Sequence, residues 1–174
     1  ALVGDHCVGV TSDQADALLS VDRGLRYFSA AIRELFEESG VLLAAVGGRG
    51  VDLAASRDAL NEGTLDWRRF VVDNHVQLLC DALHYFSFWI TPKALPRRFS
   101  TRFFLAAMPA DQDAEHCGGE LTDSCWLSAE DALAAHRDGA ISLHFPTIRT
   151  LEALAAHATL DELLEWAANR AREG

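Results

Sequence analysis

Residues 31–41, Ala-Ile-Arg-Glu-Leu-Phe-Glu-Glu-Ser-Gly-Val, constrain the fold of this chain more than any other stretch. At about 100° of rotation per residue, a helix brings three carboxylates, Glu34, Glu37 and Glu38, within about one quarter of its circumference. The apolar side chains gather on the opposite side, and they are Phe28, Ile32, Leu35 and Phe36. Gly40 follows in the usual position for a residue that closes a helix in the left-handed conformation. The stretch therefore predicts an amphipathic helix over residues 29–39 that carries an acidic ridge.

The three carboxylates of the acidic ridge repel one another unless a positive charge lies nearby. They belong to Glu34, Glu37 and Glu38. Like charges three or four residues apart on a helix cost a few tenths of a kcal/mol per pair. A divalent cation would offset this repulsion, because Mg²⁺ and Mn²⁺ prefer hard carboxylate oxygens. Arg33 lies one turn before Glu37 and is placed to hold it by an ion pair. From spacing alone, a solvated acidic face is an equally good interpretation.

The same residues carry a resemblance to a known family. Residues 33–41 resemble the second half of the Nudix box, Arg-Glu-apolar-x-Glu-Glu-x-Gly-apolar, at every specified position. In Nudix hydrolases this helix binds Mg²⁺ or Mn²⁺, and the enzyme cleaves a nucleoside diphosphate linked to another group. The resemblance implies that Glu34, Glu37 and Glu38 are metal ligands, that a glutamate such as Glu34 or Glu37 acts in catalysis, and that Arg33 orients Glu37.

The first half of the box departs from the family pattern. The family has Gly fourteen residues before the Arg and Glu eight residues before it, and this chain has Leu19 and Leu25 there. We assign no ligand to that half. In the resembled family two strands and a Phe-Pro-Gly-Gly turn precede the helix, and residues 1–10 do not supply that turn. We therefore expect the sequence to lack the N-terminal strands of a single Nudix domain that spans residues 1–174.

Later segments resemble one branch of the family, which includes coenzyme A diphosphatases and has a helical insertion after the box. These segments are residues 88–92, 96–106, 126–133 and 146–151. The insertion would be residues 51–82, predicted as two helices with Trp67, Phe70 and Leu78 facing the sheet or a second subunit. The resemblance implies coenzyme A or acyl-coenzyme A as substrate, and a homodimer. Hydrolysis of NADH, ADP-ribose or another dinucleotide, or a Nudix-fold binding module without catalysis, are the alternatives.

Positive residues and a further carboxylate complete the candidate site. In a chain of net charge −11, an anionic substrate needs a local positive patch, and the densest cluster includes Lys93, Arg97 and Arg98. Arginine forks suit the paired oxygens of a diphosphate, although pairing with the surplus acids is the other interpretation. Glu120 follows Gly118-Gly119 and is the main candidate for a further metal ligand, with Glu115 as its alternative. Arg102 lies in a predicted strand, where a structural role is equally good.

Composition limits the class of protein. With 174 residues, 49% of them hydrophobic, the chain can bury one sizeable core. No apolar run reaches the ~18 residues that cross a bilayer, which predicts no membrane partner. The net charge of −11 argues against nucleic acid as the main partner. Four cysteines without a Cys-x-x-Cys pair are typical of a reduced cytoplasmic protein.

Periodicity and capping residues predict an α+β fold, by resemblance a Nudix-type α/β/α sandwich with a mixed sheet. Besides residues 29–39, the predicted helices are residues 11–19, 52–60, 66–82, 128–136, a helix that begins at Pro146, and residues 159–172. The predicted strands are residues 41–46, 85–90, 102–108 and 121–127.

Overall fold

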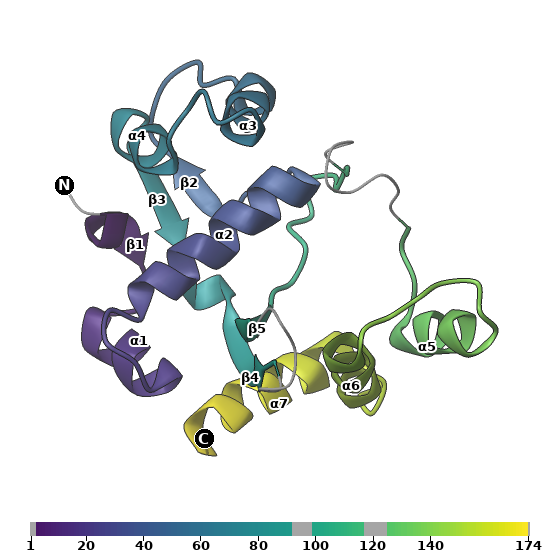
Figure 1. The fold of residues 1–174 in the computed structure, drawn as a ribbon. Helices are drawn as coiled ribbons and strands as arrows, with labels where there is room; N and C mark the ends of the chain where they lie inside the picture. Colours follow the sequence, from purple (N-terminus) through teal and green to yellow (C-terminus); the bar gives the residue numbers. More distant parts are fainter. Residues whose placement is uncertain (1–2, 92–98, 117–124, 174) are drawn as a thin grey trace. The chain divides into compact units, whose positions relative to one another are not determined.

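The computed structural model describes residues 3–91, 99–116 and 125–173, with side chains as far as residue 169. Contacts between Cα atoms divide the chain into two compact units. The first consists of Ala1–Leu83 and Ala106–Ser124, and the second of His84–Leu105 and Cys125–Gly174. Each unit holds one of the two β-sheets shown in Figure 1.

The first unit contains a three-stranded mixed sheet and four α-helices. In chain order its elements are η1 (Val3–His6), β1 (Cys7–Val8), α1 (Ser12–Leu19), α2 (Leu25–Ser39), β2 (Ala44–Val46), α3 (Leu53–Asn61), α4 (Trp67–Asp73), β3 (Val76–Leu79) and η2 (Cys80–Ala82). The strand order is β1-β3-β2, with β3 parallel to β1 and antiparallel to β2. Figure 1 shows α2 as the longest helix of this unit.

The second unit is a two-stranded antiparallel sheet with three helices. Its elements are β4 (His84–Ile90), β5 (Ser100–Leu105), α5 (Ala129–Arg137), α6 (Phe145–Leu154) and α7 (Leu160–Glu173). α7 packs on β4 through Trp166 and Phe86, whose ring centroids lie 5.8 Å apart. The α+β class with a mixed sheet is therefore confirmed. Among the described residues, no helix has both the length and the apolar character needed to cross a bilayer.

The amphipathic helix α2 forms as its sequence predicts, but it begins four residues earlier, at Leu25. Its apolar side lies in the core, where Phe28, Ile32 and Phe36 are all almost completely buried. Gly40 ends the helix with φ of 76°, a left-handed conformation that favours glycine, and its N–H donates to the Phe36 carbonyl at 2.9 Å.

The helix predicted over residues 66–82 is wrong in its second half. α4 ends at Asp73, and Val76–Leu79 forms β3, the central strand of the sheet. His75 has φ of 50°, which stops the helix, and burial then alternates with a period of two, with Val76 and Leu78 inside. In the predicted helical insertion of residues 51–82, only α3 and α4 are α-helices.

Other element boundaries also differ from the sequence predictions. The strand predicted over residues 41–46 is shorter in the structure, as β2 (Ala44–Val46), and the strand predicted over residues 102–108 is β5 (Ser100–Leu105). Of the strand predicted at residues 121–127, residues 121–124 lie outside the described residues and residues 125–127 are irregular. Thr11 and Ser128 are the N-caps of α1 and α5, and the side chain of each accepts the backbone N–H of the residue three positions further on.

Candidate active site

The acidic ridge lies in the last two turns of α2, and Arg33 pairs with two of its carboxylates. Arg33 forms an ion pair with Glu34, and its Nε lies 3.6 Å from Oε2 of Glu37. The side chain of Glu34 is 51% exposed and that of Glu37 only 21%. The pair with Glu37 is the i,i+4 contact that the spacing predicts, and it holds the more buried carboxylate in place.

Glu37 has a perturbed titration. Its partial burial raises the pKa of the carboxyl group above the ordinary value, because burial disfavours the charged form. The positive charge of Arg33 acts in the opposite direction, and the negative charge of Glu34 adds to the rise in pKa. Glu37 therefore occupies the kind of environment in which functional carboxylates are often found.

The C-terminal end of α2 is held by α3. Arg57 donates from Nε to the Glu37 carbonyl at 3.1 Å and from Nη2 to the Glu38 carbonyl at 2.8 Å. Asn61 Nδ2 donates to the same Glu37 carbonyl at 3.1 Å. The last carbonyls of a helix lack partners within the helix, and a positive charge there is favoured by the helix dipole. These bonds fix the backbone that carries two carboxylates of the ridge.

Gly40 is favoured here for a second reason besides its positive φ. A Cβ atom at this position would lie 3.1 Å from Nη1 of Arg57, closer than nearly all such contacts in proteins. The glycine therefore makes room for the guanidinium that holds the end of α2.

A loop from later in the chain reaches the same end of α2. The side-chain amide of Gln112 accepts from the Leu42 N–H at 2.8 Å and donates to the Leu42 carbonyl at 3.0 Å. The Glu115 N–H donates to the Ser39 carbonyl at 2.8 Å, and the Glu115 carbonyl accepts from Arg57 Nη2 at 2.7 Å. Glu115, the alternative to Glu120 in the sequence analysis, is thus anchored by its backbone beside the end of α2, and its side chain is exposed.

The apolar side of α2 is covered by α4. The rings of Phe36 and Phe70 are stacked, with centroids 5.7 Å apart and planes 17° apart. Trp67 Nε1 donates to Ser29 Oγ at 3.0 Å. The sequence predicted that Trp67 and Phe70 face the sheet or a second subunit, but in the structure both contact α2. Leu78 is completely buried in β3.

Comparison with known proteins identifies the family. A family model described as the NUDT19 Nudix domain matches residues 10–154. The chain belongs to this Nudix family. Two relatives called acyl-coenzyme A diphosphatase NUDT19, from Xenopus laevis and Homo sapiens, are each 30% identical to it over 163 and 162 residues. In both cases the match covers 83% of this chain and 43% of the relative, so the chain spans less than half the length of these proteins.

A solved structure supports the same conclusion. The crystal structure of a Nudix hydrolase from Alicyclobacillus acidocaldarius superposes with a TM-score of 0.68 at 27% sequence identity. The match covers 77% of this chain and 63% of that chain. The resemblance of residues 33–41 to the Nudix box is therefore confirmed at the level of the family.

Several predicted site residues are not placed by the structure. Glu120, Lys93, Arg97 and Arg98 lie outside the described residues. Within the described residues, no group of three or more His, Cys, Asp or Glu side chains is arranged so that it could hold a metal ion. Arg102 is described, and its Cζ lies 4.7 Å from the centroid of the Phe88 ring, which supports a structural role in the hairpin.

The sequence analysis did not predict that Arg57, Asn61 and Gln112 support the end of α2, the Nudix helix. All three bind backbone groups of elements distant in the chain, such as Glu37, which lies 20 residues before Arg57. A backbone carbonyl is present at every residue, so the sequence contains no pattern that pairs it with a particular side chain.

Arg57→Ala is expected to lower the free energy of unfolding by about 1–3 kcal/mol, because charged hydrogen bonds to helix carbonyls are lost. Arg57→Lys keeps the charge without the planar fork and is expected to recover only part of this loss. Urea unfolding measures the effect. The matched control is Arg69→Ala on α4, whose 75% exposed side chain pairs with Asp73 at 3.9 Å. Equal effects of Arg57→Ala and Arg69→Ala would contradict the supporting role of Arg57.

Proposed function

We propose that the chain is a metal-dependent Nudix pyrophosphohydrolase and that its substrate is coenzyme A or an acyl-coenzyme A. The observation that carries the proposal is the ridge of Glu34, Glu37 and Glu38 on a helix whose C-terminal end is held by Arg57. The family match and the names of the two NUDT19 relatives support the substrate class.

The ridge supplies the type of oxygen donor that Mg²⁺ or Mn²⁺ prefers, although its three carboxylates are not gathered around one point in the structure. Glu34, Glu37 and Glu38 offer hard oxygen donors from one side of one helix, and Glu120 would add another from a later segment. The bound cation would neutralise charge on the diphosphate and lower the pKa of a water molecule. A divalent ion would compete with the single positive charge of Arg33 for Glu34 and Glu37, which are only partly buried.

The residues of the chain have separate roles in this proposal. Glu34 and Glu37 are the catalytic carboxylates, and Arg33 orients Glu37 through their ion pair. Lys93, Arg97 and Arg98 would contact the diphosphate, since arginine forks match paired phosphate oxygens. The resemblance also supports a homodimer, which sedimentation would test, and the four scattered cysteines support a reduced, cytoplasmic setting.

A Nudix-fold binding module without catalysis is the second candidate. It is favoured by the first half of the box, where Leu19 takes the position of the family's glycine. Leu19 is the last residue of α1 and is only 4% exposed, so this position is part of the core.

A substrate panel separates these functions. We expect turnover of coenzyme A or acyl-coenzyme A with Mg²⁺ or Mn²⁺ to exceed that of NADH and ADP-ribose at equal concentrations, measured by separation of the nucleotide products. A preference for NADH or ADP-ribose would contradict the substrate class. Binding of these compounds without hydrolysis of any of them would favour the binding module.

A further inference from the structure

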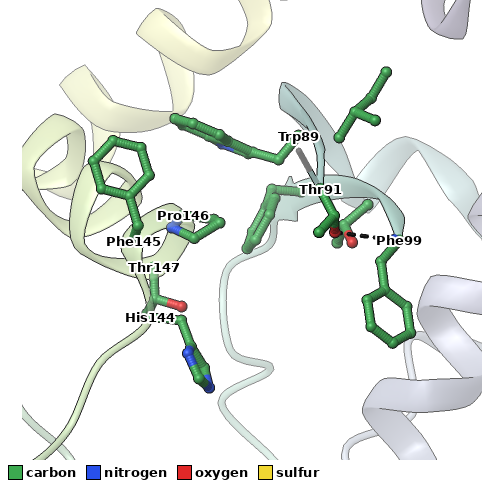
Figure 2. Close-up of a pocket in the computed structure, with 10 residues that line it drawn as sticks. Trp89, Thr91, Phe99, His144, Phe145, Pro146 and Thr147 are labelled. Carbon is green, nitrogen blue, oxygen red and sulfur yellow. Dashed lines mark hydrogen bonds between the residues drawn. The ribbon is translucent and has the colours of Figure 1, made fainter. Parts of the chain in front are cut away.

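The second unit contains an apolar pocket that the Nudix helix does not form. It has a volume of about 760 Å³ and lies between the β4–β5 hairpin and the N-terminal end of α6 (Figure 2). β4 contributes Trp89 and Ile90 to its lining, and β5 contributes Phe103. Phe99, just before β5, and Phe145 and Pro146 of α6 also line it. A volume of this size is in the range of pockets that bind small molecules.

The lining is exposed to solvent although it is apolar. Phe99 and Phe145 are each 65% exposed, and Ile90 is 54% exposed. Exposed apolar surface of this kind, gathered in one concave place, is typical of a ligand-binding site. The pocket would therefore gain affinity from any ligand that removes these side chains from water.

The described lining of the pocket has few polar groups. Its lining includes no carboxylate and no Arg or Lys among the described residues, and His144 is its one ionisable side chain there. Thr91 Oγ1 already accepts the Phe99 N–H at 2.9 Å. The described lining is therefore an apolar surface that suits an uncharged aliphatic group, and it offers few of the charged donors that a diphosphate needs.

The ring geometry also disfavours a nucleobase. The rings of Trp89 and Phe145 meet edge to face, with planes 87° apart and centroids 5.6 Å apart. Figure 2 shows these two rings on opposite elements of the pocket. A base gains most by stacking between parallel rings, and this pair offers no parallel slot. A flexible aliphatic chain fits rings in any relative orientation.

We propose that this pocket binds the acyl chain of an acyl-coenzyme A. The inference rests on the proposed function, because that function supplies a substrate with an aliphatic end. Each methylene group moved from water into an apolar site tightens binding by about fourfold. The pocket therefore makes the chain select longer acyl groups over acetyl and over free coenzyme A.

Binding of acyl-pantetheines tests the pocket without any diphosphate chemistry. S-octanoyl-pantetheine contains the acyl end of the substrate and no bond that a pyrophosphohydrolase cleaves. By isothermal titration calorimetry without divalent metal, we expect it to bind the chain at least ~10-fold more tightly than pantetheine, since several methylenes enter the pocket. Equal affinities for the two compounds would overturn the inference.

Variants locate the site. Phe145→Ala, which removes a 65% exposed ring from the pocket, is expected to remove most of the advantage of the octanoyl compound. Thermal melting checks that loss of its contact with Trp89 leaves the chain folded. Trp126→Ala is the matched control, because Trp126 is an aromatic residue of the same unit, is 76% exposed and does not line the pocket. An unchanged preference for the octanoyl compound in Phe145→Ala would overturn the assignment. So would a Phe145→Ala variant that binds adenosine more weakly than the wild-type chain but keeps its affinity for the octanoyl compound.

Turnover by the same preparation separates the two proposals. Hydrolysis of coenzyme A with no preference among acetyl, octanoyl and palmitoyl derivatives would overturn the acyl pocket and leave the proposed function intact. Failure to hydrolyse any of these compounds would overturn the proposed function, whatever the calorimetry shows. A KM that falls with acyl length in the wild-type chain, but not in Phe145→Ala, is the expected result.

Discussion

Glu37→Gln and Glu38→Gln are each expected to reduce turnover of coenzyme A substrates by about 10²-fold or more while the chain stays folded. Gln keeps the shape of Glu but removes a charge that a divalent cation needs, so the loss falls on metal binding and on catalysis. Steady-state kinetics with Mg²⁺ and Mn²⁺ measures the loss, and thermal melting reports on the fold.

The fold should tolerate these substitutions because the ridge lies on the partly exposed side of α2. The ion pair between Arg33 and Glu37 joins side chains that are 38% and 21% exposed, and such pairs contribute about 1 kcal/mol or less. Glu152→Gln on α6 is the matched control, because it removes an ion pair with Arg149 from a helix that carries none of the ridge. Turnover close to wild type in both ridge variants would contradict the catalytic assignment.

Local sequence signals predicted the helix that carries the ridge and the positions of α1 and α5. The apolar and acidic sides of α2 follow from the 3.6-residue period, and the burial of Ile32 and Phe36 confirms that pattern. The N-caps at Thr11 and Ser128 also depend only on residues within one turn of the helix. Predictions of this kind succeed because the interacting groups are close together in the chain.

Long-range contacts decided the features that the sequence did not predict. Residues 76–79 contain apolar residues that also fit a helix, but pairing with β1 and β2 makes them the central strand. The support of α2 by Arg57 depends on the position of α3, which no local pattern specifies. The ridge itself could be recognised from residues 33–41, whereas its supports required the folded arrangement.

Phe70→Ala is expected to have the largest effect on stability, lowering the free energy of unfolding by about 3–5 kcal/mol. Phe70 is completely buried and Phe36 is 1% exposed, so truncation of either ring leaves a cavity between α4 and the Nudix helix. Urea unfolding followed by circular dichroism measures the change. Leu53→Ala on α3 is the control, since Leu53 is 38% exposed and its truncation should cost far less.

A double-mutant cycle then tests whether α4 stabilises the Nudix helix directly. If the stacked rings interact, the combined effect of Phe36→Ala and Phe70→Ala will differ from the sum of the single effects by about 0.5–1.5 kcal/mol. Strictly additive effects would mean that the two rings are stabilised by separate parts of the core.

The contacts of α3 and α4 with α2 also limit what a deletion of residues 51–82 can show. Removing α3 and α4 would take away both Arg57 and Phe70, so a deletion cannot isolate a role of this segment in substrate choice. Single substitutions on the outer faces of α3 and α4 leave these supports in place, and changes in substrate preference among such variants would report on recognition alone.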